Sequence, residues 1–264
     1  MRDELAGPGT QQCPACQQML RNDARFCARC GYAITASMPP PMRIVATPSV
    51  APFASHLKEI KRVSWLFGLL LFSSFLLGTI DRNGTSPWPA AFTSVFDALI
   101  VLLFVGIRYR DIQPLLRLPH LNARAALGLF GVALVFVTGM SIYFALIKHL
   151  GVPMLRTTDI YQKSGWPVWS MFVLISVMPA VFEELAFRGV IQSTLEHVFD
   201  KREAWLIQAA LFSVLHLLPM AFPSHFLMGL SFGYLRLRSK SLYPGMVLHA
   251  TWNALVLYQE LYWF

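Results

Sequence analysis

The sequence has little charge, and it has no cysteine after residue 30. Only 14% of its 264 residues are charged, whereas soluble domains carry about 25%. This low charge, together with 55% hydrophobic residues, excludes an ordinary soluble domain and predicts long apolar helices. The first 55 residues contain no apolar stretch of the kind that forms a cleavable signal peptide, so we expect none.

Two further classes lose support from what the sequence lacks. It has no HExxH pattern, so the type of zinc site that places two histidines and a glutamate on one helix is not indicated. The net charge of +8 raises the question of nucleic-acid binding. The Lys and Arg residues lie mainly in short loops between apolar segments, which is typical of membrane topology. We therefore expect a lipid bilayer as the partner and no nucleic acid.

All four cysteines lie near the N-terminus in two CxxC pairs, at Cys13, Cys16, Cys27 and Cys30. This spacing predicts a small zinc ribbon over residues 1–31, with the four thiolates on one structural zinc ion. Gly31 suits the tight turn after the second pair, and Gln17 stands at the matching place after the first. Two disulfides or four free thiols are the alternatives. A ribbon of this kind could recruit a protein partner, which the sequence does not identify.

The rest of the chain divides into a linker and a membrane region. Residues 32–56 contain five prolines among small and polar residues, and we predict an extended linker. Residues 57–264 are predicted to form an all-α, polytopic transmembrane helical bundle of about seven spans, because lipid offers backbone polar groups no other partner. The expected spans are 63–80, 90–107, 125–147, 167–189, 204–220, 224–238 and 242–262.

The basic residues of the loops predict the orientation of these spans. Lysine and arginine precede the first span and fill the second, fourth and sixth loops, whereas the first loop has only Arg82 and the fifth has no charge. By the positive-inside rule, this alternation places the N-terminus in the cytoplasm. The third loop is also basic and weakens the pattern. A cytoplasmic N-terminus leaves the cysteines reduced, which favours zinc over disulfides.

Ionisable and amide side chains occur inside the last apolar segments, where they are costly and indicate function. They are Glu183, Glu184, Arg188, His216, His249 and Asn253. Glu184 and Arg188 are four residues apart and can pair on one helix face, which leaves Glu183 pointing elsewhere. His249 and Asn253 share a face in the same way. Pro179 is expected to kink the helix just before the two glutamates.

One carboxylate with two imidazoles supports two hydrolytic mechanisms. Glu183, His216 and His249 could hold a zinc-like catalytic ion. Alternatively, the glutamate activates a water while the histidines and asparagine stabilise the oxyanion. A polar network that only holds helices together is the structural alternative. Counting residues places Glu183 near the inner end of its span and His216 near the outer end of the next, so we predict an elbow over 189–200 that brings them together.

Three motifs in this region resemble those of the CAAX protease and bacteriocin-processing family, also called the Abi or CPBP family. Residues 183–188 (EELAFR) look like its EExxxR motif, 212–216 (FSVLH) like FxxxH, and 249–253 (HATWN) like HxxxN, all in the family's order. The resemblance covers about residues 165–257. It implies an all-helical intramembrane endopeptidase, commonly labelled a metalloprotease, that cleaves a membrane-associated protein. A bacterial plasma membrane is the expected location.

The resemblance also implies the roles of individual residues. Glu183 would activate the water, with Glu184 and Arg188 supporting it. His216, His249 and Asn253 would complete the site, and no cofactor-binding residues are expected besides the metal ligands. A non-catalytic membrane partner or immunity-type protein on the same fold is the main alternative, and a transporter that uses these groups as an ion relay is another.

Three other features are read as structural. Residues 229–233 (GLSFG) match the GxSxG pattern of serine hydrolases, but no strand precedes them, and the glycine spacing is that of packed membrane helices. Asp97 is a lone acid in the second span and is read as a contact between helices. His197 and His225 are expected at the membrane interface, outside the site.

Overall fold

The computed structural model describes residues 9–34, 53–80, 86–119, 122–152 and 156–262. The five prolines of the expected linker and Arg82 lie outside the described residues. The chain divides into two compact units, one before and one after the boundary between residues 50 and 51. Each unit is described by itself.

The N-terminal unit is built from two similar turns around the cysteine pairs. Strands β1 (Thr10–Gln12) and β2 (Met19–Arg21) pair in antiparallel fashion and enclose the first turn. Gln17 and Gly31 follow the two CxxC pairs and have φ angles of 60° and 72°, in the left-handed region. Their N–H groups donate to the carbonyls of Cys13 and Cys27 at 2.9 and 2.8 Å. The expected tight turns are therefore present, and glutamine adopts at the first the conformation that glycine favours at the second.

The second unit is entirely helical. Its long helices are α1 (Phe53–Ile80), α2 (Trp88–Ile107), α4 (Ala123–His149), α9 (Lys201–Leu215), α10 (Phe222–Ser239) and α11 (Tyr243–Tyr262). The short elements are α3 (Tyr109–Ile112), η1 (Gln113–Leu116), α5 (Thr158–Lys163) and η4 (Pro219–Ala221). A further continuous helix runs through α6 (Val168–Met171), η2 (Phe172–Val177), α7 (Met178–Glu183), η3 (Glu184–Ile191) and α8 (Gln192–Leu195).

Four helices of the described chain are long and apolar enough to cross a membrane: Ala54–Ile80, Trp88–Ile107, Ala123–His149 and Val168–Leu195. They correspond to the first four expected spans, so the all-helical membrane fold is confirmed. The helices α9, α10 and α11 form where the last three spans were predicted, but they do not meet the same criteria of length and composition. The count of about seven spans therefore stays a prediction.

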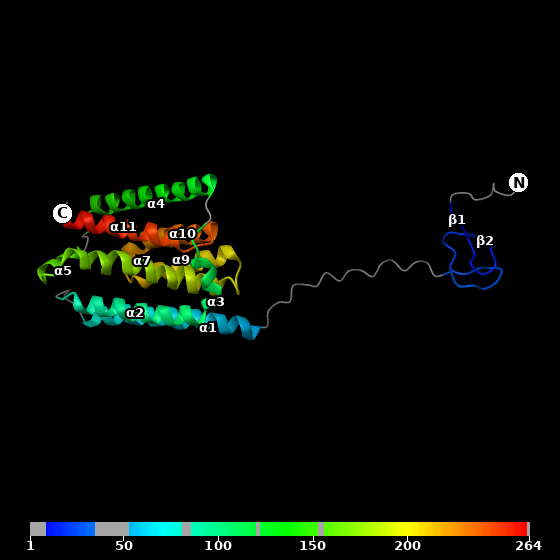
Figure 1. Ribbon diagram of the computed structural model, residues 1–264, viewed down its shortest axis with the longest axis horizontal. Coiled ribbons are helices and arrows are strands. Elements are labelled where there is room, and N and C mark those ends of the chain that lie inside the picture. The colour runs from blue at the N-terminus through cyan, green and yellow to red at the C-terminus, as the bar shows by residue number, and fades with distance from the viewer. Residues whose placement is uncertain (1–8, 35–52, 81–85, 120–121, 153–155, 263–264) are drawn as a thin grey trace. The chain divides into compact units, whose positions relative to one another are not determined.

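The helices of this unit pack in layers (Figure 1). The pair α1 and α2 lies on one side, α4 lies on the opposite side, and the helices that carry the polar residues lie between them. The larger of two cores of buried apolar side chains runs through these layers and includes Leu66, Val101, Phe136, Phe187 and Phe232. The arrangement surrounds α7, η3 and α9 with protein, which is where charged groups can be paired away from lipid.

The helix that carries both glutamates contains two π-helical segments, η2 and η3. Such segments are rare and are often found at functional sites. The predicted elbow over 189–200 is wrong, because residues 189–195 continue the helix and the chain turns only at 196–200. Glu183 lies twelve residues before Leu195, and His216 lies fifteen residues after α9 begins at Lys201. The two therefore reach similar heights without an elbow.

The helices α9 and α10 approach each other closely through glycine. A Cβ atom on Gly229 would lie 2.6 Å from the Cα of Ala209, and one on Gly233 would lie 2.5 Å from Nε2 of Gln208. Gln208 is fully buried and donates to the carbonyl of Gly229 at 2.8 Å. The GxSxG pattern thus lies within a helix, α10, and its glycines serve helix packing.

Candidate active site

The start and the end of α9 together set the position of His216. Asp200 accepts hydrogen bonds from the N–H groups of Arg202 and Glu203, and Glu203 accepts one from Asp200, so a capping box begins the helix. Leu217 has a φ of 54°, and this left-handed residue ends the helix. His216 is therefore the last residue before the turn, where its ring can reach back toward the helix.

Glu184 and Arg188 form a buried ion pair, as their spacing predicts. Nη1 of Arg188 lies 2.9 Å from Oε1 of Glu184, and the two side chains are 0% and 1% exposed. Nη2 of Arg188 also donates to the carbonyl of Met228 at 3.4 Å. The guanidinium stacks over the Phe212 ring, 4.4 Å from its centroid. Burying a charge is costly without such partners, so these contacts fix the guanidinium in place.

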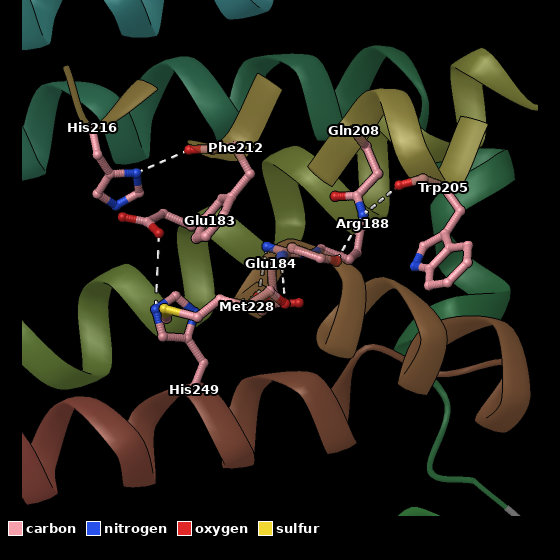
Figure 2. A network of polar contacts seen from close by, with 10 residues as sticks. Glu183, Glu184, Arg188, Trp205, Gln208, Phe212, His216, Met228 and His249 are labelled. Atoms are coloured by element: carbon pink, nitrogen blue, oxygen red, sulfur yellow. Dashed lines mark hydrogen bonds and ion pairs between the residues drawn. The ribbon is translucent and has the colours of Figure 1, made fainter. Parts of the chain in front are cut away.

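His249 lies between the two glutamates. Its Nδ1 is 3.3 Å from Oε1 of Glu184, and its Nε2 is 3.9 Å from Oε2 of Glu183. The imidazole is almost fully buried, at 2% exposure, while the Glu183 side chain is 26% exposed. One edge of the ring therefore faces the buried ion pair, and the other faces Oε2 of Glu183, an oxygen that is buried although the side chain as a whole is partly exposed. Figure 2 shows this chain of contacts from Arg188 to Glu183.

The Glu184 carboxylate occupies space that a glycine leaves open. A Cβ atom on Gly245, which precedes His249 by one helical turn, would lie 2.8 Å from Oε2 of Glu184. Real Cβ atoms do not approach this closely, so with any other residue the Glu184 carboxylate would have to shift. Gly245 cannot be recognised from the sequence, because its spacing of four to His249 gives no sign of what the helix faces.

His216 is oriented by the helix that it ends. Its Nδ1 lies 2.9 Å from the carbonyl oxygen of Phe212, and because a carbonyl only accepts, Nδ1 carries the proton. The Phe212 ring lies against both imidazoles, with centroid distances of 5.0 Å to His216 and 6.2 Å to His249. In Figure 2 the Glu183 carboxylate is drawn between these two rings.

Asn253 contacts the backbone of the glutamate-bearing helix. Its Nδ2 donates to the carbonyl of Ile175 at 3.1 Å. This carbonyl would accept from position 179 in an α-helix, but Pro179 has no N–H. Asn253 therefore supplies a donor where the proline removes one. Nearby, the hydroxyl of Ser176 donates to the carbonyl of Ala250 at 2.8 Å. Each of the two elements, α11 and η2, therefore donates one hydrogen bond to the other.

The expected catalytic set does not gather around one point as metal ligands do. Among the described residues, only the four cysteines bring three or more ligand atoms within 4.8 Å of one another. Glu183, His216 and His249 do not meet that spacing.

The four cysteine sulfurs, in contrast, fit a tetrahedral metal. The Sγ atoms of Cys13 and Cys30 are 3.7 Å apart, and those of Cys16 and Cys27 are 3.6 Å apart. Sulfurs about 2.3 Å from one zinc ion would be separated by about 3.8 Å in a tetrahedron. All four cysteines are unbonded to each other. The N–H of Cys30 lowers the pKa of the Cys27 thiol to about 6. At Cys30 the backbone N–H of Tyr32 lowers the pKa, but hydrogen bonds with the other cysteine sulfurs outweigh it and raise the pKa to about 12.

Two predictions about neighbouring residues have different outcomes. The reading of Asp97 as a helix contact is confirmed, because the hydroxyl of Ser73 on α1 donates to its Oδ1 at 2.6 Å. The interfacial position expected for His225 stays a prediction, but its ring lies next to the candidate site, with its centroid 3.7 Å from that of His216. Residue spacing could not reveal this contact, since the two histidines belong to different helices.

These observations define a helical membrane protein in which two glutamates, an arginine and two histidines meet inside the bundle. The family model described as Rce1-like, Type II CAAX prenyl endopeptidase Rce1-like, matches residues 165–255. Those residues therefore form an Rce1-like region, and the resemblance to the CAAX protease and bacteriocin-processing family is confirmed. No curated protein and no solved structure matches the chain.

Proposed function

We propose that this protein is an intramembrane endopeptidase that hydrolyses a membrane-associated protein with a water activated by Glu183. The observation that carries the proposal is the contact series from Arg188 through Glu184 and His249 to Glu183. The family match supports it, because Rce1-like proteins are typically proteases. A bundle that only needed stability would gain nothing from a second carboxylate beside a pair that is already complete.

The charges of this cluster favour one additional proton. Glu183 and Glu184 contribute two negative charges, and Arg188 contributes one positive charge. A proton on His249 balances the sum and lets both ring nitrogens donate, Nδ1 to Glu184 and Nε2 toward Glu183. Unbalanced buried charge costs several kcal/mol, and a proton on Glu183 would balance the sum equally. We take the form with the proton on His249 as the reactive one, because it leaves Glu183 able to accept a proton from water.

The reaction then needs three transfers. Glu183 takes a proton from the water as the water oxygen bonds to the carbonyl carbon of the scissile peptide. The carbonyl electron pair moves to its oxygen, and the Nε2–H of His249 donates to the resulting oxyanion. Glu183 then returns the proton to the leaving nitrogen as the C–N bond breaks, which releases a carboxylic acid and an amine.

His216 has a different task from His249 in this scheme. Because its Nδ1–H donates to the Phe212 carbonyl, the neutral ring has a lone pair on Nε2. That nitrogen can accept a hydrogen bond from the attacking water but cannot donate to an oxyanion. We therefore assign His216 to the water, and Asn253 to holding α11 against the helix of the glutamates.

The test is a comparison of membrane proteins by terminal-peptide mass spectrometry. Membranes that contain the wild type should gain new protein termini, and membranes with Glu183→Gln should not. Glu203→Gln is the matched control, because a capping box accepts glutamine as well as glutamate, and it should cleave like the wild type. Identical profiles from three folded and equally abundant proteins would contradict the protease and favour the non-catalytic membrane partner.

We also propose that the N-terminal cysteines hold one zinc ion and that this unit lies in the cytoplasm of a bacterial cell. The sulfur spacing and the paired turns support zinc. The wild type should contain one zinc per chain, and Cys13→Ser should contain none and lose protease resistance in residues 9–34. Zinc retention should fall as the pH is lowered, because protons compete with the ion for the four thiolates. Equal metal content in both proteins would overturn this assignment.

A further inference from the structure

A third histidine lies against the candidate active site. His225 is in the first turn of α10, and its ring is tilted by 39° to that of His216 at a centroid distance of 3.7 Å. The Phe212 ring lies 6.2 Å from His225 and 5.0 Å from His216, so one aromatic side chain borders both imidazoles. No motif of the sequence includes His225, and none of the proposed steps uses it.

The two histidines are held in the same way. Nδ1 of His225 lies 2.8 Å from the carbonyl of Ala221, four residues earlier, just as Nδ1 of His216 bonds the carbonyl of Phe212. Each carbonyl accepts, so each Nδ1 carries a proton, and each neutral ring has its lone pair on Nε2. Ser224 donates to the carbonyl of Ala221 and lies 3.3 Å from Nδ1 of His225. These bonds leave the His225 ring little freedom to rotate.

We propose that His225 belongs to the active site and acts through His216, as a positioning residue for the hydrolysis. This inference rests on the proposed function. His216 ends its helix and is followed by a left-handed residue. Its ring makes one hydrogen bond to the backbone, at the Phe212 carbonyl. The His225 ring covers one face of the His216 ring and keeps Nε2 directed toward the water. Catalysis depends on such alignment, because displacements of about 1 Å can cost about a hundredfold in rate.

A metal site is the other chemistry that two histidines suggest, and the geometry does not favour it. The two rings lie against each other at a tilt of 39°, and in the described chain only the cysteines bring three ligand atoms together. Ligands of one ion instead converge on a point with their nitrogens. The pair is therefore better explained as a packing contact between two rings.

Two substitutions distinguish the contribution of the His225 ring from that of its hydrogen bond. His225→Phe keeps an aromatic ring over His216 and loses the bond to Ala221. His225→Asn keeps a donor near the place of Nδ1 and loses the ring. We expect the rate at which Glu183-dependent termini accumulate to fall about tenfold or more with His225→Asn and His225→Ala, and to stay within about threefold of the wild type with His225→Phe. His197→Ala, an exposed histidine outside the site, should have no effect.

A second measurement does not depend on activity. The decrease in thermal midpoint of the double variant His216→Ala/His225→Ala should be smaller than the sum of the decreases of the two single variants, because either substitution alone already removes the contact. Additive midpoints, a wild-type rate with His225→Ala, or an equal loss with His225→Phe and His225→Asn would each overturn the positioning role. If the wild type and Glu183→Gln are equally inactive, the proposed function itself fails, and the inference about His225 fails with it.

Discussion

The membrane unit contains two kinds of helix that composition alone does not separate. Within one 18-residue apolar stretch of each helix, 22%, 22% and 17% of the residues are buried in α1, α2 and α4, which we call the outer spans, whereas 44% are buried in Val168–Leu195. All four are long and apolar. We call Val168–Leu195 and α9 to α11 the inner helices. The difference shows that length and apolarity identify a helix suited to a membrane, while burial within the protein identifies the helix that can carry paired charges.

The sharpest test of this comparison replaces an acid by its amide in each kind of helix. Glu184→Gln removes the buried charge that pairs with Arg188, and we expect it to lower the free energy of unfolding by about 3 kcal/mol or more. Asp97→Asn, in the outer span α2, keeps an oxygen that can accept from Ser73 and should cost less than about 1 kcal/mol. Unfolding in detergent by denaturant measures both. Equal losses would mean that the two environments do not differ.

A substitution of glycine by alanine tests the packing side of the same comparison. Gly229→Ala in α10 would force a Cβ atom against the backbone of Ala209, and we expect a loss of about 1–3 kcal/mol as α9 and α10 separate. Gly131→Ala in α4 meets no atom within 4 Å and should be neutral or stabilising by up to about 1 kcal/mol, because alanine favours a helix. The thermal midpoints of the two variants in detergent, each compared with the wild type, measure this difference. A neutral Gly229→Ala would contradict close packing of the inner helices.

The smallest expected effect on the free energy of unfolding concerns Asn253, which donates to a carbonyl that Pro179 cannot serve. Asn253→Ala should cost about 1 kcal/mol, because the Ile175 carbonyl loses a donor. In a Pro179→Ala background, the backbone N–H at position 179 can take over, so the same change should cost clearly less. Pro89→Ala is the outer-span control, since a proline in the first turn of α2 removes no helical hydrogen bond. An unchanged cost of Asn253→Ala in the Pro179→Ala background would show that the asparagine does not compensate for the proline.

Much of the candidate site could be predicted from local spacing. Residues four apart on a helix share a face, and this rule alone paired Glu184 with Arg188 and directed Glu183 elsewhere. The same local reasoning placed the turn after the second CxxC pair, because glycine readily adopts the left-handed conformation there. The structure adds that Gln17, a departure from glycine, adopts it after the first pair. Local reasoning failed for the predicted elbow over 189–200, because the position of Glu183 along the bundle depends on where its own helix ends. That helix continues to Leu195, beyond its apolar run.

The sequence by itself determined the class of fold, the cysteine cluster, the first four apolar helices and the faces of the motif residues, since all of these follow from composition and short-range periodicity. Only the tertiary structure decided that His249 contacts both glutamates, that Gly245 leaves room for the Glu184 carboxylate, and that His225 covers His216. Each of these contacts joins residues on different helices. Such distances are set by how helices pack and where they end, and helical spacing within one segment carries no information about either.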